Sequence, residues 1–168
     1  MSLILTHDPN EYALCPPGMH QATIVDAVAL GQIETPWGAK PMVSLVVQTE
    51  LLDETGKPYI LAKRFTRSLH EKASLRQALE HLRGKKFTPN ELHDGIDLES
   101  YVGMPCIILI VHNDTAERTY ANIEAFLPPA SGKVAKIPEN SSGTYQRVKD
   151  RPDYKSPDEY AQHVNGAQ

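Results

Sequence analysis

The chain has 168 residues, of which 40% are hydrophobic and 23% charged, and its formal net charge at pH 7 is −4. These values are typical of one folded domain, and no apolar run approaches the ~20 residues that a membrane-spanning helix needs. The two cysteines and seven histidines lack the spacing of a zinc site, so we expect neither a metal nor a cofactor.

The first part of the chain predicts three strands. Residues 18–32 follow a Pro-Pro-Gly turn signal and predict the first strand, and the Val- and Leu-rich residues 41–52 predict the second. Proline and glycine between them mark a loop with Trp37 at its tip. Residues 58–68 alternate as a third strand, which a short glycine-containing turn joins to the second in a hairpin.

The period of the pattern changes after the third strand, where leucines at helical spacing predict a helix over 68–84. Ser68 and Glu71 fit a capping box at its start, and Gly84 fits a C-cap at its end. In the connector that follows, Thr88 precedes a proline and predicts the first turn of a short helix.

The rest of the chain predicts two strands and a tail. Residues 105–114 form a nearly all-apolar strand, and residues 118–128 alternate as a last strand. After them the composition shifts to Pro, Ser, Gly, Asn and charge, which indicates a flexible tail, or an extended arm on the domain, with a short helix near its end. We therefore expect an N-terminal arm at 1–17, one domain at 18–128 and a tail at 129–168.

The predicted order of elements, β-β-β-α-β-β, is that of an all-β domain with one inserted helix: the five-stranded OB-fold barrel, here with a flexible C-terminal tail. An open meander with one helix is the structural alternative. The residues expected in the core are Ile24, Val28, Leu45, Val47, Leu61, Ile107, Leu109, Val111 and Ile123 of the strands and Leu75, Leu79 and Leu82 of the helix.

Positive charge is concentrated in one segment of this acidic chain. Residues 57–86 hold nine basic and two acidic side chains, a formal charge of +7, whereas the other residues hold eight basic and nineteen acidic ones. Such asymmetry indicates a face that meets an anion. The alternative is a basic helix face that is simply solvated.

An OB fold binds oligonucleotides on its second and third strands and on the flanking loops. Single-stranded nucleic acid needs cations along its phosphates and rings on which bases stack, and both residue types occur at these positions. The candidate nucleic-acid-binding residues are Trp37, Lys63, Arg64, Phe65, Arg67, His112 and Tyr120. For two of these residues a structural role is the alternative to DNA binding. Phe65 could lie in the core, and Trp37 could fold over the open end of the barrel.

Three segments carry a resemblance to a known group: "ETPWG" at 34–38, "KRFTRSLHEKASLRQALEHLRGKKFT" at 63–88, and "GMPCIILIVHND…TYANIEAFLP" at 103–128. Together they resemble small OB-fold single-stranded DNA-binding proteins of tailed bacteriophages and prophages. The resemblance covers residues 16–128 and implies a role in phage DNA replication or recombination. The chain ends in "YAQHVNGAQ" and lacks the acidic, hydrophobic tip through which bacterial single-strand-binding proteins recruit partners.

These observations predict a non-catalytic, largely sequence-independent single-stranded DNA-binding protein. Its expected partners are single-stranded DNA and phage or host replication and recombination proteins, and homo-oligomerisation is left open. The start of the chain lacks the features of a secretory signal, so we expect the protein in the cytoplasm of a bacterial host, without membrane association.

Two other function classes are the alternatives. The first is a protein-interaction or structural phage module that does not bind nucleic acid. The second is a nuclease in which Asp94, Asp97 and Glu99 hold Mg²⁺. The same three residues also fit a loop whose aspartates cap helices, and the chain has none of the common catalytic motifs. We therefore expect no catalytic residues.

Overall fold

The computed structural model describes residues 14–129, 147–152 and 154–166. Its strands are β1 (Gly18–Thr35), β2 (Gly38–Leu52), β3 (Pro58–Thr66), β4 (Pro105–Asp114) and β5 (Thr119–Leu127). Its helices are α1 (Ser74–Arg83), α2 (Pro89–Asp94) and α3 (Pro157–Gly166), with short 3-10 helices η1 (Leu98–Tyr101) and η2 (Val148–Asp150). The expected element order is therefore confirmed.

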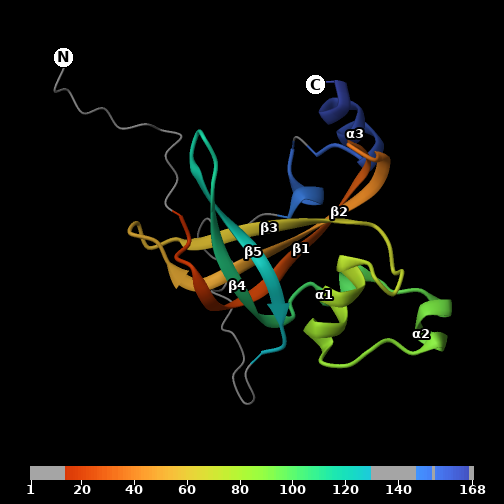
Figure 1. Cartoon of the computed structure of the whole chain (residues 1–168), viewed down its shortest axis with the longest axis horizontal. Coiled ribbons are helices and arrows are strands. Elements are labelled where there is room, and N and C mark those ends of the chain that lie inside the picture. Colours follow the sequence, from red (N-terminus) through yellow and green to blue (C-terminus); the bar gives the residue numbers. More distant parts are fainter. Residues whose placement is uncertain (1–13, 130–146, 153, 167–168) are drawn as a thin grey trace.

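All five strands belong to one antiparallel sheet in the order β3-β2-β1-β4-β5. Because β4 pairs with β1 and not with β3, the sheet is not a simple meander. Among the described residues, no ladder of hydrogen bonds joins the two edge strands β3 and β5. The fold is thus a barrel-like all-β sheet that stays open along this seam (Figure 1).

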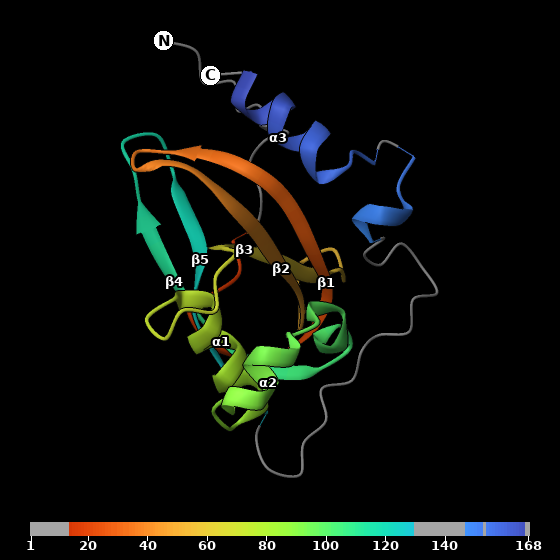
Figure 2. The same cartoon turned by 90° about the vertical axis from the view of Figure 1, so that its right-hand side faces the viewer.

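The length and curvature of β1 shape the sheet. Its first residues pair with β4 and the remainder with β2, and its ladder with β2 is interrupted between Ile24 and Asp26 and again between Ala29 and Gly31. Bulges of this kind bend a strand and increase its twist. Gly31 has φ 72°, a conformation that favours glycine. Figure 2 shows β1 and β2 as a long, bent pair that rises away from α1 and α2.

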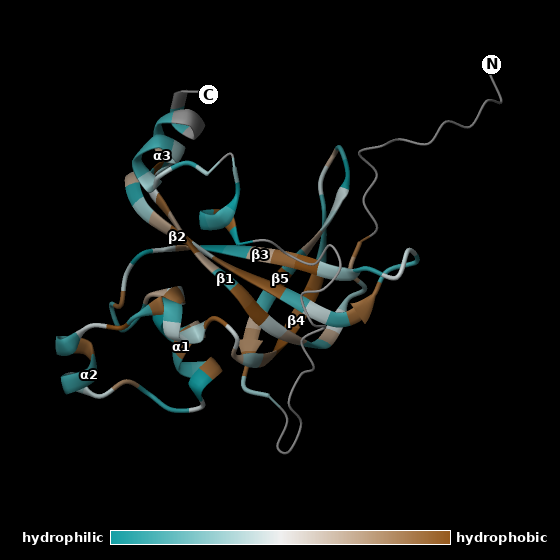
Figure 3. Ribbon diagram, turned by 180° about the vertical axis from the view of Figure 1, so that it is seen from behind, coloured by the Kyte–Doolittle hydropathy of each residue, from teal (hydrophilic) through white to brown (hydrophobic). Residues whose placement is uncertain are grey.

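The core lies between the inner face of the curled sheet and α1. Leu75, Leu79 and Leu82 of α1 are buried as expected, and α1 packs against β3 and β5 beside the seam. Across the seam, the rings of Phe65 and Phe126 lie 6.1 Å apart. Figure 3 shows the hydrophobic residues concentrated on the strands, whereas α2 is largely hydrophilic.

The predicted core of β4 has the wrong parity. Cys106, Ile108 and Ile110 are buried, whereas the expected Ile107 and Leu109 are only half-buried. An apolar run without alternation carries no information on which side faces inward. Val111, Leu61 and Val28 are half-buried as well, whereas Ile24, Leu45, Val47 and Ile123 lie in the core as predicted.

The first helix begins later than predicted. Ser68 accepts a hydrogen bond from the amide of His70 and so closes a local turn, and α1 starts at Ser74 after Ala73. The expected end at Gly84 is confirmed, with φ 75°. The expected cap at Thr88 is also confirmed, as part of a capping box at the start of α2.

The described part of the expected tail lies against the sheet. We call residues 147–152 and 154–166 the C-terminal arm. Ser156 accepts a hydrogen bond from the amide of Glu159 in the first turn of α3, and α3 packs beside the β1–β2 hairpin (Figures 1 and 2). Residues 130–146, and most of the expected N-terminal arm, lie outside the described residues.

Candidate nucleic-acid interface

Lys63 and Phe65 lie at the seam of the sheet and not on its outer face. The Lys63 Nζ donates a hydrogen bond of 3.0 Å to the carbonyl of Ile123 in β5 and lies 5.6 Å from the centre of the Phe65 ring. Phe65 itself is 4% exposed. The core alternative for Phe65 is therefore correct, and its ring is not exposed to a ligand.

Arg64 and Arg67 lie elsewhere. Successive side chains of a strand point to opposite faces, so Arg64 projects outward, where its Nη2 donates a hydrogen bond of 2.8 Å to the hydroxyl of Tyr160 in α3. Arg67 follows β3, and its amide donates to the carbonyl of Pro41. Of the four candidate residues, Lys63 and Phe65 thus lie at the seam, Arg64 on the outer side of the sheet, and Arg67 beyond the end of β3.

The other candidate residues lie on two hairpins. Trp37 is 81% exposed at the β1–β2 turn. Tyr120 lies on the β4–β5 hairpin, where the Arg118 guanidinium is 4.5 Å from the centre of its ring. His112 is on the same hairpin, with its Nε2 2.8 Å from the carbonyl oxygen of Cys15. Figure 1 shows the two hairpins at separate corners of the molecule.

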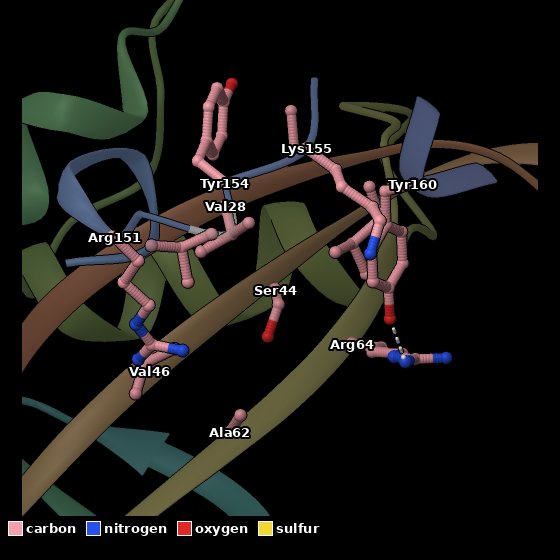
Figure 4. Close-up of a pocket in the computed structure, with 12 residues that line it drawn as sticks. Val28, Ser44, Val46, Ala62, Arg64, Arg151, Tyr154, Lys155 and Tyr160 are labelled. Atoms are coloured by element: carbon pink, nitrogen blue, oxygen red, sulfur yellow. Dashed lines mark hydrogen bonds between the residues drawn. The ribbon is translucent and has the colours of Figure 1, made fainter. Parts of the chain in front are cut away.

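A cavity of about 530 Å³ lies between the outer face of the sheet and the C-terminal arm. We call it the outer cavity. Its lining residues are Val28, Ala29, Leu30, Ser44, Val46, Ala62 and Arg64 of β1–β3 and Val148, Arg151, Tyr154, Lys155 and Tyr160 of the arm. Figure 4 shows Arg64 beside Tyr160 and Arg151 extending from the arm toward Val46.

The lining of the outer cavity is cationic although the chain as a whole is acidic. Arg64, Arg151 and Lys155 supply three positive charges, and none of the described residues in the lining is acidic. The floor is apolar, and Tyr154 at 46% exposure presents an accessible ring. Charge focused in a recess with low-dielectric walls attracts anions to it.

A second cavity of about 550 Å³ adjoins the outer cavity, because Val28 and Ala29 line both. Arg67 and Ser68 contribute cationic and hydroxyl groups to it, and its opposite wall is formed by residues 96–99. Arg64 and Arg67 therefore line two different cavities that adjoin at Val28 and Ala29. The second cavity is not cationic overall, because Asp97 and Glu99 line it together with Arg67.

The arm is held against the sheet by Arg147. Its Nη1 and Nη2 donate hydrogen bonds of 2.9 and 2.7 Å to the two carboxylate oxygens of Glu99, and its Nε lies 3.1 Å from the Oδ1 of Asp26. Asp26 is 1% exposed, and its Oδ2 accepts a further bond from the amide of Val148. A buried carboxylate of this kind requires such partners.

The far end of the arm has its own attachment. Asn165 donates from its Nδ2 to the carbonyl of Gln32, and its Oδ1 accepts from the amide of Glu34. Gly31 permits the close approach of α3, because an added Cβ would lie 2.3 Å from the carbonyl oxygen of Pro157. The arm is thus attached at both ends of the outer cavity.

Acid should weaken the attachment of the arm at Glu99. Hydrogen bonds from Arg147 hold the pKa of Glu99 below its ordinary value of 4.5. The pair therefore stabilises the docked arm fully above pH 4.5, and this contribution is lost as the pH falls through the lower folded pKa. NMR shifts of α3 amides followed below pH 5 should report this step, which should be absent in Glu99→Gln; identical acid titrations of the two proteins would contradict it.

The remaining basic side chains of residues 57–86 do not converge on one surface. Arg83 pairs with Glu91 at 2.7 Å, and this contact holds the pKa of Glu91 at about 2. Arg76 donates to the carbonyl of Leu69 and pairs with Glu80. Much of the positive charge of α1 is therefore matched within the helix and its neighbours.

Two of the three acidic residues proposed for a Mg²⁺ site, Asp97 and Glu99, have structural roles in the described part of the chain. Asp97 caps η1 by accepting a hydrogen bond from the amide of Glu99, and Glu99 binds Arg147. Within residues 14–129, 147–152 and 154–166, no three His, Cys, Asp or Glu side chains are grouped as a metal site requires. Both cysteines are buried and unpaired, and burial raises the pKa of Cys106 to about 12.

Sequence reasoning missed the arm's contribution to this interface. Arg151, Tyr154, Lys155 and Tyr160 were assigned to a tail or arm without a role in binding. Their stretch "RPDYKSPDEY" contains the cations and rings of a single-strand site, but it also contains three acidic residues that obscure this signal. Asp26, a lone acidic residue in an apolar strand, is the corresponding signal for a buried partner.

The comparisons with known proteins add no family assignment: neither a protein-family model nor a curated protein matches the chain. In the part of the chain that the structure describes, no helix has the length and apolar character needed to cross a membrane.

Proposed function

We propose that the protein binds single-stranded DNA without catalysing a reaction, in the replication or recombination of phage DNA inside a bacterial host cell. The observation that carries this proposal is the chemistry of the outer cavity. Arg64, Arg151 and Lys155 surround an apolar floor next to Tyr154 and Tyr160, with no acidic side chain among the described lining residues. Cations for phosphates and rings for bases are the two requirements of a single-strand site.

The topology supports the proposal. The strand order β3-β2-β1-β4-β5, with a helix between β3 and β4, is compatible with an OB fold, a partly open barrel that binds oligonucleotides over its second and third strands. Ser44, Val46, Ala62 and Arg64, which line the outer cavity, belong to β2 and β3. We therefore assign the fold to the OB class as part of this proposal.

The lining also favours unpaired bases of any sequence. We expect the recess between sheet and arm to admit a splayed nucleotide and to exclude the paired and stacked bases of a duplex. Base edges are usually read by Asn, Gln, Asp, Glu, Arg and Lys. Of these, only Arg and Lys occur among the described residues that line the cavity. Stacking and phosphate contacts tolerate every base, so we expect little sequence preference.

Fluorescence anisotropy of a labelled oligo-dT tests the proposed function. The protein should bind dT at low salt and lose affinity linearly on a logarithmic salt scale, because each phosphate contact releases counterions. Unlabelled duplex DNA should compete poorly, and an rU competitor reports the preference for DNA over RNA. No binding of dT at low salt would overturn the proposal and leave the protein-interaction module. That alternative is favoured by exposed Leu52 and Ile60 at the end of the β2–β3 hairpin.

Trp37 is the candidate ring on the β1–β2 hairpin. If a base stacks on it, Trp37→Ala should weaken dT binding by about 1–3 kcal/mol. Thermal stability should stay nearly unchanged, because the side chain is 81% exposed. Anisotropy and thermal unfolding measured on the same samples check both parts. If Trp37→Ala bound dT as tightly as wild type, Trp37 would not be part of the DNA-binding surface.

A further inference from the structure

We infer that the C-terminal arm is the second wall of the DNA site, so that Arg147 controls DNA affinity without touching DNA. This inference rests on the proposed function and deepens it. It assigns phosphate contacts to Arg151 and Lys155 of the arm, opposite Arg64 of the sheet, and it makes Arg147 a positioning residue that holds the arm against Asp26 and Glu99.

The composition of the two walls carries the first step. On the sheet side, the only cation among the described lining residues of the outer cavity is Arg64. The arm contributes Arg151 and Lys155, and it also supplies the rings of Tyr154 and Tyr160. Without the docked arm, the sheet would keep one of the three cations and neither of the two tyrosine rings found among the described lining residues.

The attachment of the arm carries the second step. The guanidinium of Arg147 makes contacts of 2.7–3.1 Å with Glu99 and Asp26. Arg147 is absent from the lining of the outer cavity, whereas its neighbour Val148 lines it. The contacts of Arg147 therefore fix the first residues of the arm against the sheet. A substitution that breaks these contacts should move Arg151 and Lys155, which follow Arg147 in the sequence.

The sign of the charge decides between two roles for the arm. An arm that competed with DNA would place acidic side chains in the cavity, where they would mimic phosphates. The arm residues that line the cavity are instead Val148, two tyrosines and two cations. These groups complement a polyanion, so the docked arm and DNA favour each other's binding.

The sharpest test is Glu99→Gln. Removing a negative charge near a polyanion normally strengthens its binding, whereas loosening the arm should weaken it. We expect Glu99→Gln to bind oligo-dT more weakly than the wild-type protein, with a shallower salt dependence. The matched control is Glu71→Gln, which removes the same charge from an exposed position before α1 and should bind at least as tightly as wild type.

The direct test is Arg151→Ala with Lys155→Ala. Loss of two phosphate contacts should reduce the slope of log affinity against log salt by about 1.4. If the loss is purely electrostatic, affinity at about 50 mM salt should fall roughly 60-fold, and the difference should vanish near 1 M. A folding defect lowers the fraction of active protein and leaves the salt slope unchanged, so this readout separates the loss of DNA contacts from a folding defect.

The outcomes separate the two proposals. If the wild-type protein does not bind dT, the proposed function fails, and the arm has no DNA to hold. If wild type binds and the arm variants match its affinity and salt slope, the proposed function stands and the arm inference fails. Tighter binding by Glu99→Gln than by Glu71→Gln would also overturn the inference, because it would make the arm a competitor.

Discussion

Charge reversal at Arg64 and Lys155 should abolish the binding of single-stranded DNA. These side chains face the outer cavity from the sheet and from the arm, respectively. Loss of two charge-assisted hydrogen bonds removes about 3–6 kcal/mol of binding free energy, which corresponds to at least a ~100-fold loss of affinity. The new carboxylates would add repulsion. Anisotropy with oligo-dT at low salt measures the effect for Arg64→Glu combined with Lys155→Glu.

The control for this variant is Lys85→Glu with Lys86→Glu. It makes the same change in net charge at exposed positions after α1, outside both cavities. We expect the control to bind within a few-fold of wild type, because screened charges at a distance contribute little. Equal losses in the two variants would mean that net charge alone controls binding, and the assignment of the outer cavity would be wrong.

The largest expected loss of stability follows from Leu79→Ala. Leu79 is fully buried in α1, where the helix covers the open seam between β3 and β5. Removing a buried leucine side chain beyond Cβ costs about 2–5 kcal/mol, because the loss of transfer free energy adds to the cost of a cavity. Urea unfolding should report this decrease as a lower midpoint.

The matched variant in the same helix is Gln77→Ala, which replaces an exposed side chain. Its free energy of unfolding should stay within about 0.5 kcal/mol of wild type. If Leu79→Ala lost less than about 1 kcal/mol, the helix would not be packed into the core as described.

The elements could be predicted from the sequence because their signals are local. Glycine and proline punctuation located the strands, Gly84 located the end of α1, and Thr88 followed by Pro89 located the start of α2. The start of α1 was missed because Ser68 caps a turn just as well as a helix. Whether Ser68 caps a turn or a helix depends on tertiary packing, which cannot be read from the sequence of this segment alone.

Side-chain direction was harder to predict than element type. In β4 the unbroken apolar run gave no sign that Ile108, and not Ile107, faces the core. In β3 the adjacent cations Lys63 and Arg64 were both predicted to bind nucleic acid, although neighbours in a strand point to opposite sides. Lys63 instead joins the seam by its hydrogen bond to the carbonyl of Ile123. Charge density along the sequence was therefore a poor guide to charge density in space.

The arm could not have been placed from the sequence. Its anchor Arg147 lies 121 residues from Asp26 in the chain, and composition alone predicted a flexible tail or an extended arm on the domain, without a place for the arm. The sequence did contain one sign of the contact, the acidic residue Asp26 in an apolar strand. A buried carboxylate implies a partner, and its identity emerges only when the chain is folded.

The most direct measurement is a map of backbone amide shifts by NMR as oligo-dT is added to the full-length protein. The account predicts that the largest shifts occur at Ser44, Ala62 and Arg64 on the sheet and at Arg151 and Lys155 on the arm. Shifts confined to the seam around Lys63, or to the β4–β5 hairpin, would show that DNA binds elsewhere and would contradict the account.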